Sequence, residues 1–217
     1  NGDSVLDRFH GRLPGATQVS LGGRLISRPN PHFSGALKAE ATDPDLLSAW
    51  LRGTSETAPR AQKPLRLTGL LSVSPDRFAL DDVDADIDGA AVTGRLAVSN
   101  TTAPSAGRRL RLEAAVHGER LDLDGLIALG RSFAGPRDNW PDEADLALDL
   151  NHGSVGGQDI APVNARLAYD PRNVTLTKLS LGAAGGVTID GSGTIDRTAN
   201  SGRLTISADA QALPALS

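Results

Sequence analysis

Residues 67–98 read "LTGLLSVSPDRFALDDVDADIDGAAVTGRLAV", and apolar and polar side chains alternate over three successive segments. This period of two predicts β-strands with one apolar and one polar face, at 65–73, 77–88 and 91–99. A turn containing Pro75 separates the first two strands, and a turn at Gly89 separates the last two. Within the second strand the apolar phase slips by one residue at Asp81–Asp82, as a β-bulge requires. The stretch therefore predicts an antiparallel meander.

Part of this stretch, "DADIDG" (84–89), matches the first half of an EF-hand calcium loop. The match fails further on, because Val92 offers no oxygen at the ninth position and Arg95 replaces the glutamate of the twelfth. We therefore interpret the aspartates as the solvent-facing side of a strand, with the intervening Val83 and Ile87 on the apolar side.

The same layout recurs about 96 residues later, which indicates an internal repeat. A turn with Pro171 again separates two strands, and the longer strand again slips phase, at Thr177–Lys178. The predicted strands of this second copy lie at 162–169, 173–183 and 187–196. A fourth strand completes each copy, at 108–117 and at 202–210.

The repeat divides the chain into three parts. Residues 1–64 form the C-terminal half of a preceding β-repeat, with a short helix at about 43–53 that has Asp43 as its N-cap. Residues 65–143 form a β-repeat unit with a short helix at about 121–133, and residues 144–217 form the next unit, truncated at its end. Since the chain also lacks an initiator Met, we expect a fragment of a longer protein.

Composition excludes several classes of protein. The net charge is −4 and only 3% of residues are aromatic, so the chain offers neither a basic field nor a stacking surface for nucleic acid. Without cysteine it has no disulfide scaffold and no thiolate metal site. No apolar run reaches the roughly 18 residues of a membrane-spanning helix, and no signal peptide is present.

No catalytic or metal-binding pattern is recognisable either. The four histidines are scattered without metal-ligand spacing, and no nucleophile elbow occurs. The glycine clusters at 153–157 and 182–186 lack the spacing of a phosphate-binding loop. Trp50 and Trp140 are interpreted as packing anchors of a helix and a loop. We expect no cofactor, no metal and no enzymatic activity.

The apolar face of the predicted sheet needs a covering, and two helices of about 15 Å, at ~1.5 Å per residue, cover only part of it. The sheet folds on itself around a filled core, or it curls into an open groove that holds lipid. A third option, a membrane barrel with the apolar face outward, lacks aromatic girdles. The candidate groove-lining residues are Leu67, Leu71, Val73, Phe78, Leu80, Val83, Ile87, Val92, Leu96, Val98, Leu110, Leu112, Leu146, Leu148, Leu150, Val163, Leu167, Tyr169, Val174, Leu176, Leu179, Leu181, Ile189 and Ile195.

Residues 144–196, "ADLALDLNHGSVGGQDIAPVNARLAYDPRNVTLTKLSLGAAGGVTIDGSGTID", resemble the C-terminal region of AsmA-family proteins in strand rhythm and in the placement of small residues. Residues 65–99 show the same strand alternation and placement of small residues, with a looser match. The resemblance implies an all-β fold with a few short helices, in which repeated antiparallel β-meander units form a strongly curved, U-shaped open sheet, an incomplete barrel with an apolar groove.

The resemblance also implies a function and a location. AsmA-like proteins are anchored in the inner membrane of Gram-negative bacteria by one N-terminal helix, which would lie outside this chain, and they extend into the periplasm. They support phospholipid transport and outer-membrane biogenesis, so the implied partners are phospholipid acyl chains and other envelope proteins. The rival hypothesis is a structural or adhesive β-repeat scaffold with a filled core that acts through protein–protein contacts. A third hypothesis is a subunit of an envelope complex.

Overall fold

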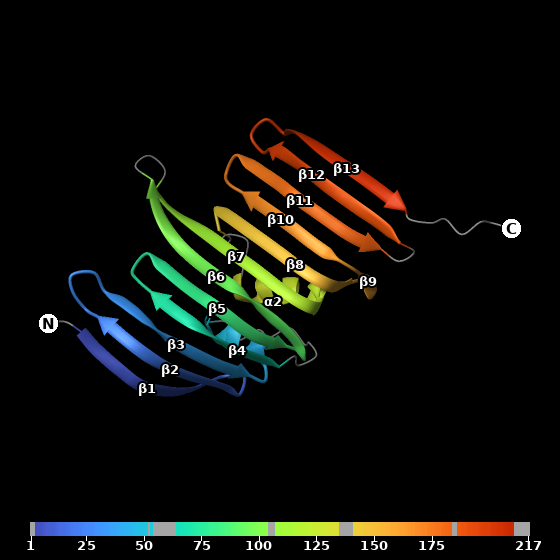
Figure 1. Ribbon diagram of the computed structural model, residues 1–217. Helices are drawn as coiled ribbons and strands as arrows, with labels where there is room; N and C mark the ends of the chain where they lie inside the picture. Colours follow the sequence, from blue (N-terminus) through green and yellow to red (C-terminus); the bar gives the residue numbers. More distant parts are fainter. Residues whose placement is uncertain are drawn as a thin grey trace.

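The structure, a computed structural model, describes residues 3–51, 53, 64–103, 107–134, 141–183 and 186–210. Within these residues one sheet of thirteen strands is accompanied by two short helices (Figure 1). The helices are α1 (Pro44–Leu51) and α2 (Leu123–Ala134). The strands are β1 (Asp3–Leu13), β2 (Thr17–Ile26), β3 (His32–Ala41), β4 (Leu65–Val73), β5 (Arg77–Ile87), β6 (Ala90–Ala103), β7 (Gly107–Asp122), β8 (Glu143–Val155), β9 (Gln158–Ile160), β10 (Val163–Tyr169), β11 (Asn173–Ala183), β12 (Val187–Asp196) and β13 (Ser201–Ala210).

Strands that follow one another in the chain also lie side by side in the sheet, as short connections favour. The order runs from β1 to β8 and continues from β10 to β13, while the short β9 pairs with β8 alone. β1 and β13 lie at opposite edges, and each pairs with a single neighbour, so the sheet is open (Figure 1). The prediction of an all-β fold, with a mostly antiparallel, unclosed sheet and a few short helices, is confirmed.

One junction departs from the predicted antiparallel meander. β7 and β8 pair in parallel, with Arg111 opposite Glu143 and Gly118 opposite Leu150. A parallel pair needs a crossover connection, and α2 stands in that connection between the two strands. The antiparallel prediction holds within each predicted unit and does not extend to this junction between two units, because alternation fixes which side chains share a face and does not fix the direction of the neighbouring strand.

Both predicted bulges are confirmed. The register shifts between Leu80 and Val83 in β5 and between Leu176 and Leu179 in β11. Asp82 adopts a positive φ of 48° inside the first bulge. Each bulge returns the next apolar residue to the face that the preceding ones occupy, so the apolar face stays continuous along both strands.

The glycine of "DADIDG" belongs to a hairpin turn between β5 and β6. Asp88 and Gly89 both have positive φ, 57° and 81°, as the central residues of a type I′ turn require. The Gly89 N–H donates a hydrogen bond of 2.9 Å to Oδ1 of Asp86. The sequence that matches an EF-hand loop therefore serves as the end of a strand and a tight turn.

The helices bury the apolar face at one end of the strands only. α1 and α2 contact each other, and Figure 1 places them together on one side of the sheet. Asp43 caps α1, because its Oδ1 accepts a hydrogen bond of 3.0 Å from the N–H of Leu46. Leu126 of α2 packs against a buried cluster of the sheet, which consists of Val92, Leu121, Leu150 and Val163.

Candidate functional site

The strand registers bring the predicted groove residues together in rows that cross the whole sheet. One row passes close to the helices and joins residues that are directly opposite each other on successive strands. It consists of Gly11, Val19, Ala39, Leu67, Ala85, Val92, Gly118, Leu150, Val163, Leu181, Ile189 and Ala208. A row further from the helices consists of Leu6, Gly23, Gly35, Leu71, Leu80, Leu96, Ala114, Leu146, Leu167, Leu176, Gly193 and Leu204.

Two more rows complete the apolar face. The row between the first two contains Phe9, Leu21, Leu37 and Gly69, and beyond the bulge of β5 it continues as Val83, Gly94, Val116, Leu148, Ala165, Leu179, Gly191 and Ile206. The outermost row consists of Ser4, Leu25, Phe33, Val73, Phe78, Val98, Leu112, Ala144, Tyr169, Val174, Ile195 and Gly202. The remaining predicted residues, Ile87 and Leu110, extend this face at its two ends by the alternation of their strands.

The opposite face is polar along an equally continuous row. That row consists of His10, Ser20, Lys38, Thr68, Asp84, Thr93, His117, Asp149, Asn164, Ser180, Asp190 and Ser207. Ion pairs lie on this face, such as Arg166 to Asp149 at 2.9 Å between two strands and Arg111 to Glu113 at 3.1 Å along β7. The sheet thus separates a charged surface from an apolar one through its single thickness.

Burial of the apolar face falls from the helix end toward the open end. Leu150 and Val163 are buried near α2, whereas Phe78, Leu96 and Ile195 leave between about a third and a half of their surface exposed. Among the described residues no element packs over these exposed side chains other than their neighbours on the sheet. The apolar face is therefore a filled core beside the helices, while farther out large side chains such as Phe78, Leu96 and Ile195 are exposed between locally buried residues such as Leu80 and Ala144.

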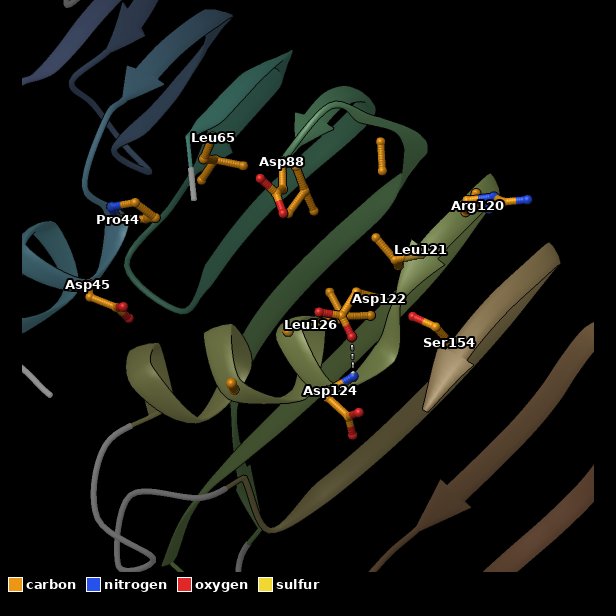
Figure 2. A pocket seen from close by; sticks show the side chains of 14 residues that line it. Pro44, Asp45, Leu65, Asp88, Arg120, Leu121, Asp122, Asp124, Leu126 and Ser154 are labelled. Atoms are coloured by element: carbon orange, nitrogen blue, oxygen red, sulfur yellow. Dashed lines mark hydrogen bonds between the residues drawn. The ribbon is translucent and has the colours of Figure 1, made fainter. Parts of the chain in front are cut away.

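A cavity of about 480 Å³ lies where the uncovered face meets the helices. Figure 2 shows Leu65 and Leu121 on the strands and Leu126 on α2 around this space. At the rim of the cavity Asp122 caps the N-terminus of α2, because Oδ1 of Asp122 accepts a hydrogen bond of 3.1 Å from the N–H of Asp124. Sequence reasoning did not include these leucines in the groove. The signal for Leu121 and Leu126 was the apolar stretch of the predicted helix 121–133, and Leu65 is the first residue of the predicted strand 65–73.

Glycine is required where backbones approach closely on the apolar side. A Cβ added to Gly94 would overlap the carbonyl oxygen of Ala115 on the neighbouring strand. A Cβ on Gly23 would likewise overlap the carbonyl oxygen of Ser34, whereas at Gly191 the nearest atom would be 3.6 Å away in ordinary contact. Close approach on one face accompanies bending of a sheet toward that face, in agreement with the predicted curvature.

The polar and aromatic groups near the apolar face have structural partners. The Tyr169 hydroxyl donates a hydrogen bond of 3.2 Å to the carbonyl oxygen of Pro141, and burial raises the pKa of this phenol. Trp50 is half exposed on α1, so its predicted packing role is only partly correct, and Trp140 lies outside the described residues. Across the part of the chain that the structure describes, no group of three or more His, Asp or Glu side chains is arranged to hold a metal ion.

Comparison with known proteins gives no match for this chain among family models, characterised proteins or solved structures. Among the described helices, none is long and apolar enough to cross a membrane.

Proposed function

We propose that this chain handles lipid without catalysing a reaction, by contacting phospholipid acyl chains along the open apolar face of its sheet. In this proposal it is a segment of an AsmA-like protein of the Gram-negative envelope. It would lie in the periplasm, be held at the inner membrane by a helix outside this chain, and support lipid transport toward the outer membrane.

The extent of the uncovered apolar face carries the proposal. The twelve strands that succeed one another across the sheet span about 50 Å at ~4.8 Å per strand, and the three apolar rows beyond the one nearest the helices span roughly 14 Å along the strands. The resulting area of about 700 Å² exceeds the roughly 300–600 Å² of the largest apolar patch on a typical monomer. A surface of this size on a folded chain with a charged opposite face calls for an apolar ligand.

The rows also suggest how such a ligand moves. Each CH₂ group transferred from water to an apolar surface contributes about 0.8 kcal/mol, whichever aliphatic side chains it contacts. Because the rows contain similar residues on every strand, an acyl chain exchanges equivalent contacts as it passes from one strand to the next. The apolar face thus lowers the barrier to passage through water and needs no chemical step.

The rival function is a structural scaffold whose apolar face is covered by another protein. The buried cluster around Leu150 and Val163 favours it to the extent that this end of the sheet already has an ordinary core. A scaffold requires the same kind of core to continue over Phe78 and Leu96 once the protein partner is bound. The two functions therefore differ in what covers these exposed residues.

The test is native mass spectrometry of the purified chain, together with extraction and identification of bound lipid. The variant Phe78→Gln/Leu96→Gln makes the apolar face polar at two exposed sites. Its matched control, Val5→Gln/Leu70→Gln, changes two large exposed apolar residues on the opposite face. Glutamine makes each site polar and adds no charge in either variant.

We expect bound phospholipid in the wild type and in the control, and a several-fold lower lipid content in the Phe78→Gln/Leu96→Gln variant, with similar melting temperatures in all three. No lipid in the wild type would contradict the proposal and favour the scaffold. Equal lipid loss in both variants would show that the lipid is bound elsewhere than on the apolar face.

A further inference from the structure

We propose that the cavity between the helices and the sheet holds the headgroup of a lipid that carries a primary ammonium group, as an ethanolamine phospholipid does. The inference rests on the proposed lipid-handling function and adds to it which lipids the chain prefers. The acyl chains of the same molecule would lie on the apolar face. Lipids with an anionic headgroup or a quaternary ammonium group would bind less tightly.

The cavity has the size and the walls of a small-molecule site. Its volume of about 480 Å³ lies within the roughly 300–1,000 Å³ of typical ligand pockets. Apolar side chains from the strands and from α2 form much of its wall, among them Leu65, Leu121 and Leu126 (Figure 2). Packed side chains seldom leave apolar space of this size unfilled, so the cavity itself points to a ligand.

Helix α1 leaves this space open because its inward side chains are small. It buries Pro44, Ser48 and Ala49, whereas Leu46 is 40% exposed. Of the residues of α1, only Pro44 and Asp45 line the cavity. A helix that served only to complete a core would turn its large apolar side chains inward. α1 therefore forms a wall of the cavity and does not fill it.

The charged groups of the cavity suit a zwitterionic headgroup. Its described lining contains four carboxylates, on Asp45, Asp88, Asp122 and Asp124, and one guanidinium, on Arg120. An ionised carboxylate has about four acceptor positions, so the backbone N–H groups bonded to Asp122 and Asp124 leave capacity for further donors. The negative excess favours a cationic group in the cavity, and Arg120 is suited to a phosphate beside it.

The absence of aromatic side chains favours a primary ammonium group over a quaternary one. A quaternary ammonium group has no N–H donor and is typically held by a cage of aromatic rings. No tryptophan, tyrosine or phenylalanine is among the described residues that line the cavity. A primary ammonium group has three N–H donors, and carboxylate oxygens are matching acceptors for them. The cavity therefore suits an ethanolamine headgroup better than a choline headgroup.

The cavity adjoins an apolar path long enough for acyl chains. Leu65 pairs with Ile87, and Ile87 pairs with Ala90, so these three cavity residues extend the apolar face by one more row. From Leu65 the face continues along β4 through Leu67 to Leu71, over roughly 20 Å at ~3.4 Å per residue. One acyl layer is about 15 Å thick, half of the ~30 Å hydrocarbon core of a bilayer. A lipid with its headgroup in the cavity can therefore lay its acyl chains on the apolar face.

Titration with three short-chain lipids tests the headgroup preference. Dihexanoyl phospholipids with ethanolamine, choline and glycerol headgroups differ in the headgroup alone, and each is used below its micelle concentration. Isothermal titration calorimetry of the purified chain measures the three affinities. We expect the ethanolamine lipid to bind several-fold more tightly than the other two. Equal affinities, or tighter binding of either other lipid, would overturn the inference.

Two aspartate-to-asparagine changes remove carboxylates and preserve the local backbone. Asparagine suits the positive φ of Asp88 in its turn, and it caps a helix about as well as Asp122 does. Asp88→Asn/Asp122→Asn should lower the affinity for the ethanolamine lipid several-fold. Its matched control, Asp84→Asn/Asp190→Asn, removes two carboxylates from the polar face and should leave that affinity unchanged. Wild-type affinity in Asp88→Asn/Asp122→Asn would contradict a headgroup in this cavity.

Filling the cavity gives an independent test. Ala128→Leu places a larger apolar side chain on a residue that lines the cavity, and it should weaken binding of the ethanolamine lipid several-fold. The matched control is Ala91→Leu, on the exposed polar face of β6, which should not change the affinity. Equal affinities for Ala128→Leu and wild type would place the headgroup elsewhere and overturn the inference.

The outcomes separate this inference from the proposed function. Phe78→Gln/Leu96→Gln should weaken binding of all three lipids and keep their order of affinity. Lipids that bind without a headgroup preference would overturn this inference alone, whereas a wild type that binds none of them would overturn both. Glycerophosphoethanolamine, which has no acyl chains, should bind several-fold more weakly than the ethanolamine lipid. Equal binding of the two would mean that the cavity takes a free amine and that a lipid is not its ligand.

Discussion

The cost of removing a leucine from the apolar face should fall with its exposure along the sheet. Leu150, Leu96 and Leu204 lie in the apolar rows on β8, β6 and β13, and they are 3%, 37% and 59% exposed. Each is replaced by alanine, so the same three carbon atoms are removed at every site. The series compares the helix-covered end of the apolar face with its uncovered part.

The expected magnitudes follow from burial. Leu150→Ala leaves a cavity in the cluster with Val92, Leu121 and Val163, and such substitutions cost about 2–5 kcal/mol. In Leu96→Ala the space left by the side chain is open to solvent and forms no closed cavity. Only the buried fraction of a ~1.5–3 kcal/mol transfer energy is then lost, about 1–2 kcal/mol. By the same reasoning Leu204→Ala should cost about 1 kcal/mol or less.

Urea unfolding followed by circular dichroism measures these free energies. The m-value should be unchanged, since each variant exposes nearly the same surface on unfolding. Equal losses of 3 kcal/mol or more, on the order of a full core substitution, at all three positions would refute the reasoning. Such losses would mean that the apolar face is covered throughout, as in a filled sandwich or a closed assembly.

Three further predictions concern the backbone, the turns and a helix cap. Gly94→Ala should destabilise the protein by about 1–3 kcal/mol in thermal unfolding because its Cβ meets backbone, whereas the control Gly191→Ala, with open contact, should change stability by less than about 1 kcal/mol. Backbone N–H groups hydrogen-bonded to Asp170 lower the pKa of that carboxyl, and a hydrogen bond from Thr198 together with nearby backbone N–H groups lowers the pKa of Asp196. The pKa values of both carboxyls are lower in the folded protein than the usual 3.8. Each ionised carboxylate therefore stabilises the folded state above that pH, and this stabilisation is lost as the pH falls through the lowered pKa values. Melting temperatures should therefore drop below about pH 4 in wild type and fall less steeply there in Asp170→Asn/Asp196→Asn; identical pH curves would contradict this assignment. Asp43→Ala should lower the stability by about 1 kcal/mol in urea unfolding, and no change would mean that the cap on α1 contributes nothing.

Much of the fold was predictable because period-two alternation is a local property. The bulge at Asp81–Asp82 was visible as a slip of the apolar phase, and the register confirms it. The helix predicted at about 43–53 is α1, and the helix predicted at about 121–133 is α2. The division into repeat units remains an interpretation of the sequence.

Other elements were missed because their local signal is weak. β1, "DSVLDRFHGRL", breaks its alternation at the register shift after Leu6 and was not recognised as a strand. β9 has three residues and is defined by its pairing with β8, which no short segment reveals. The parallel pairing of β7 with β8 was missed for the same reason, because pairing between strands cannot be read from one short segment.

The sequence predicted which residues line the candidate site and did not predict how they are arranged on the sheet. All twenty-four proposed groove residues share one face, because the phase of each strand was read correctly. Residues on the first strands, such as Phe9 and Leu37, were omitted. Leu121 was omitted as well, although it is one of the most buried apolar residues of the chain.

The sequence by itself determined which side chains lie together on each face of the sheet, including the water-facing aspartates of "DADIDG". It did so because successive residues of a strand point to opposite sides, whatever the strand packs against. Only the tertiary structure decided that the helices cover one end of the apolar face and that, among the described residues, large side chains farther along it stay exposed. Coverage depends on contacts between segments far apart in the chain, and alternation within a strand contains no information about them.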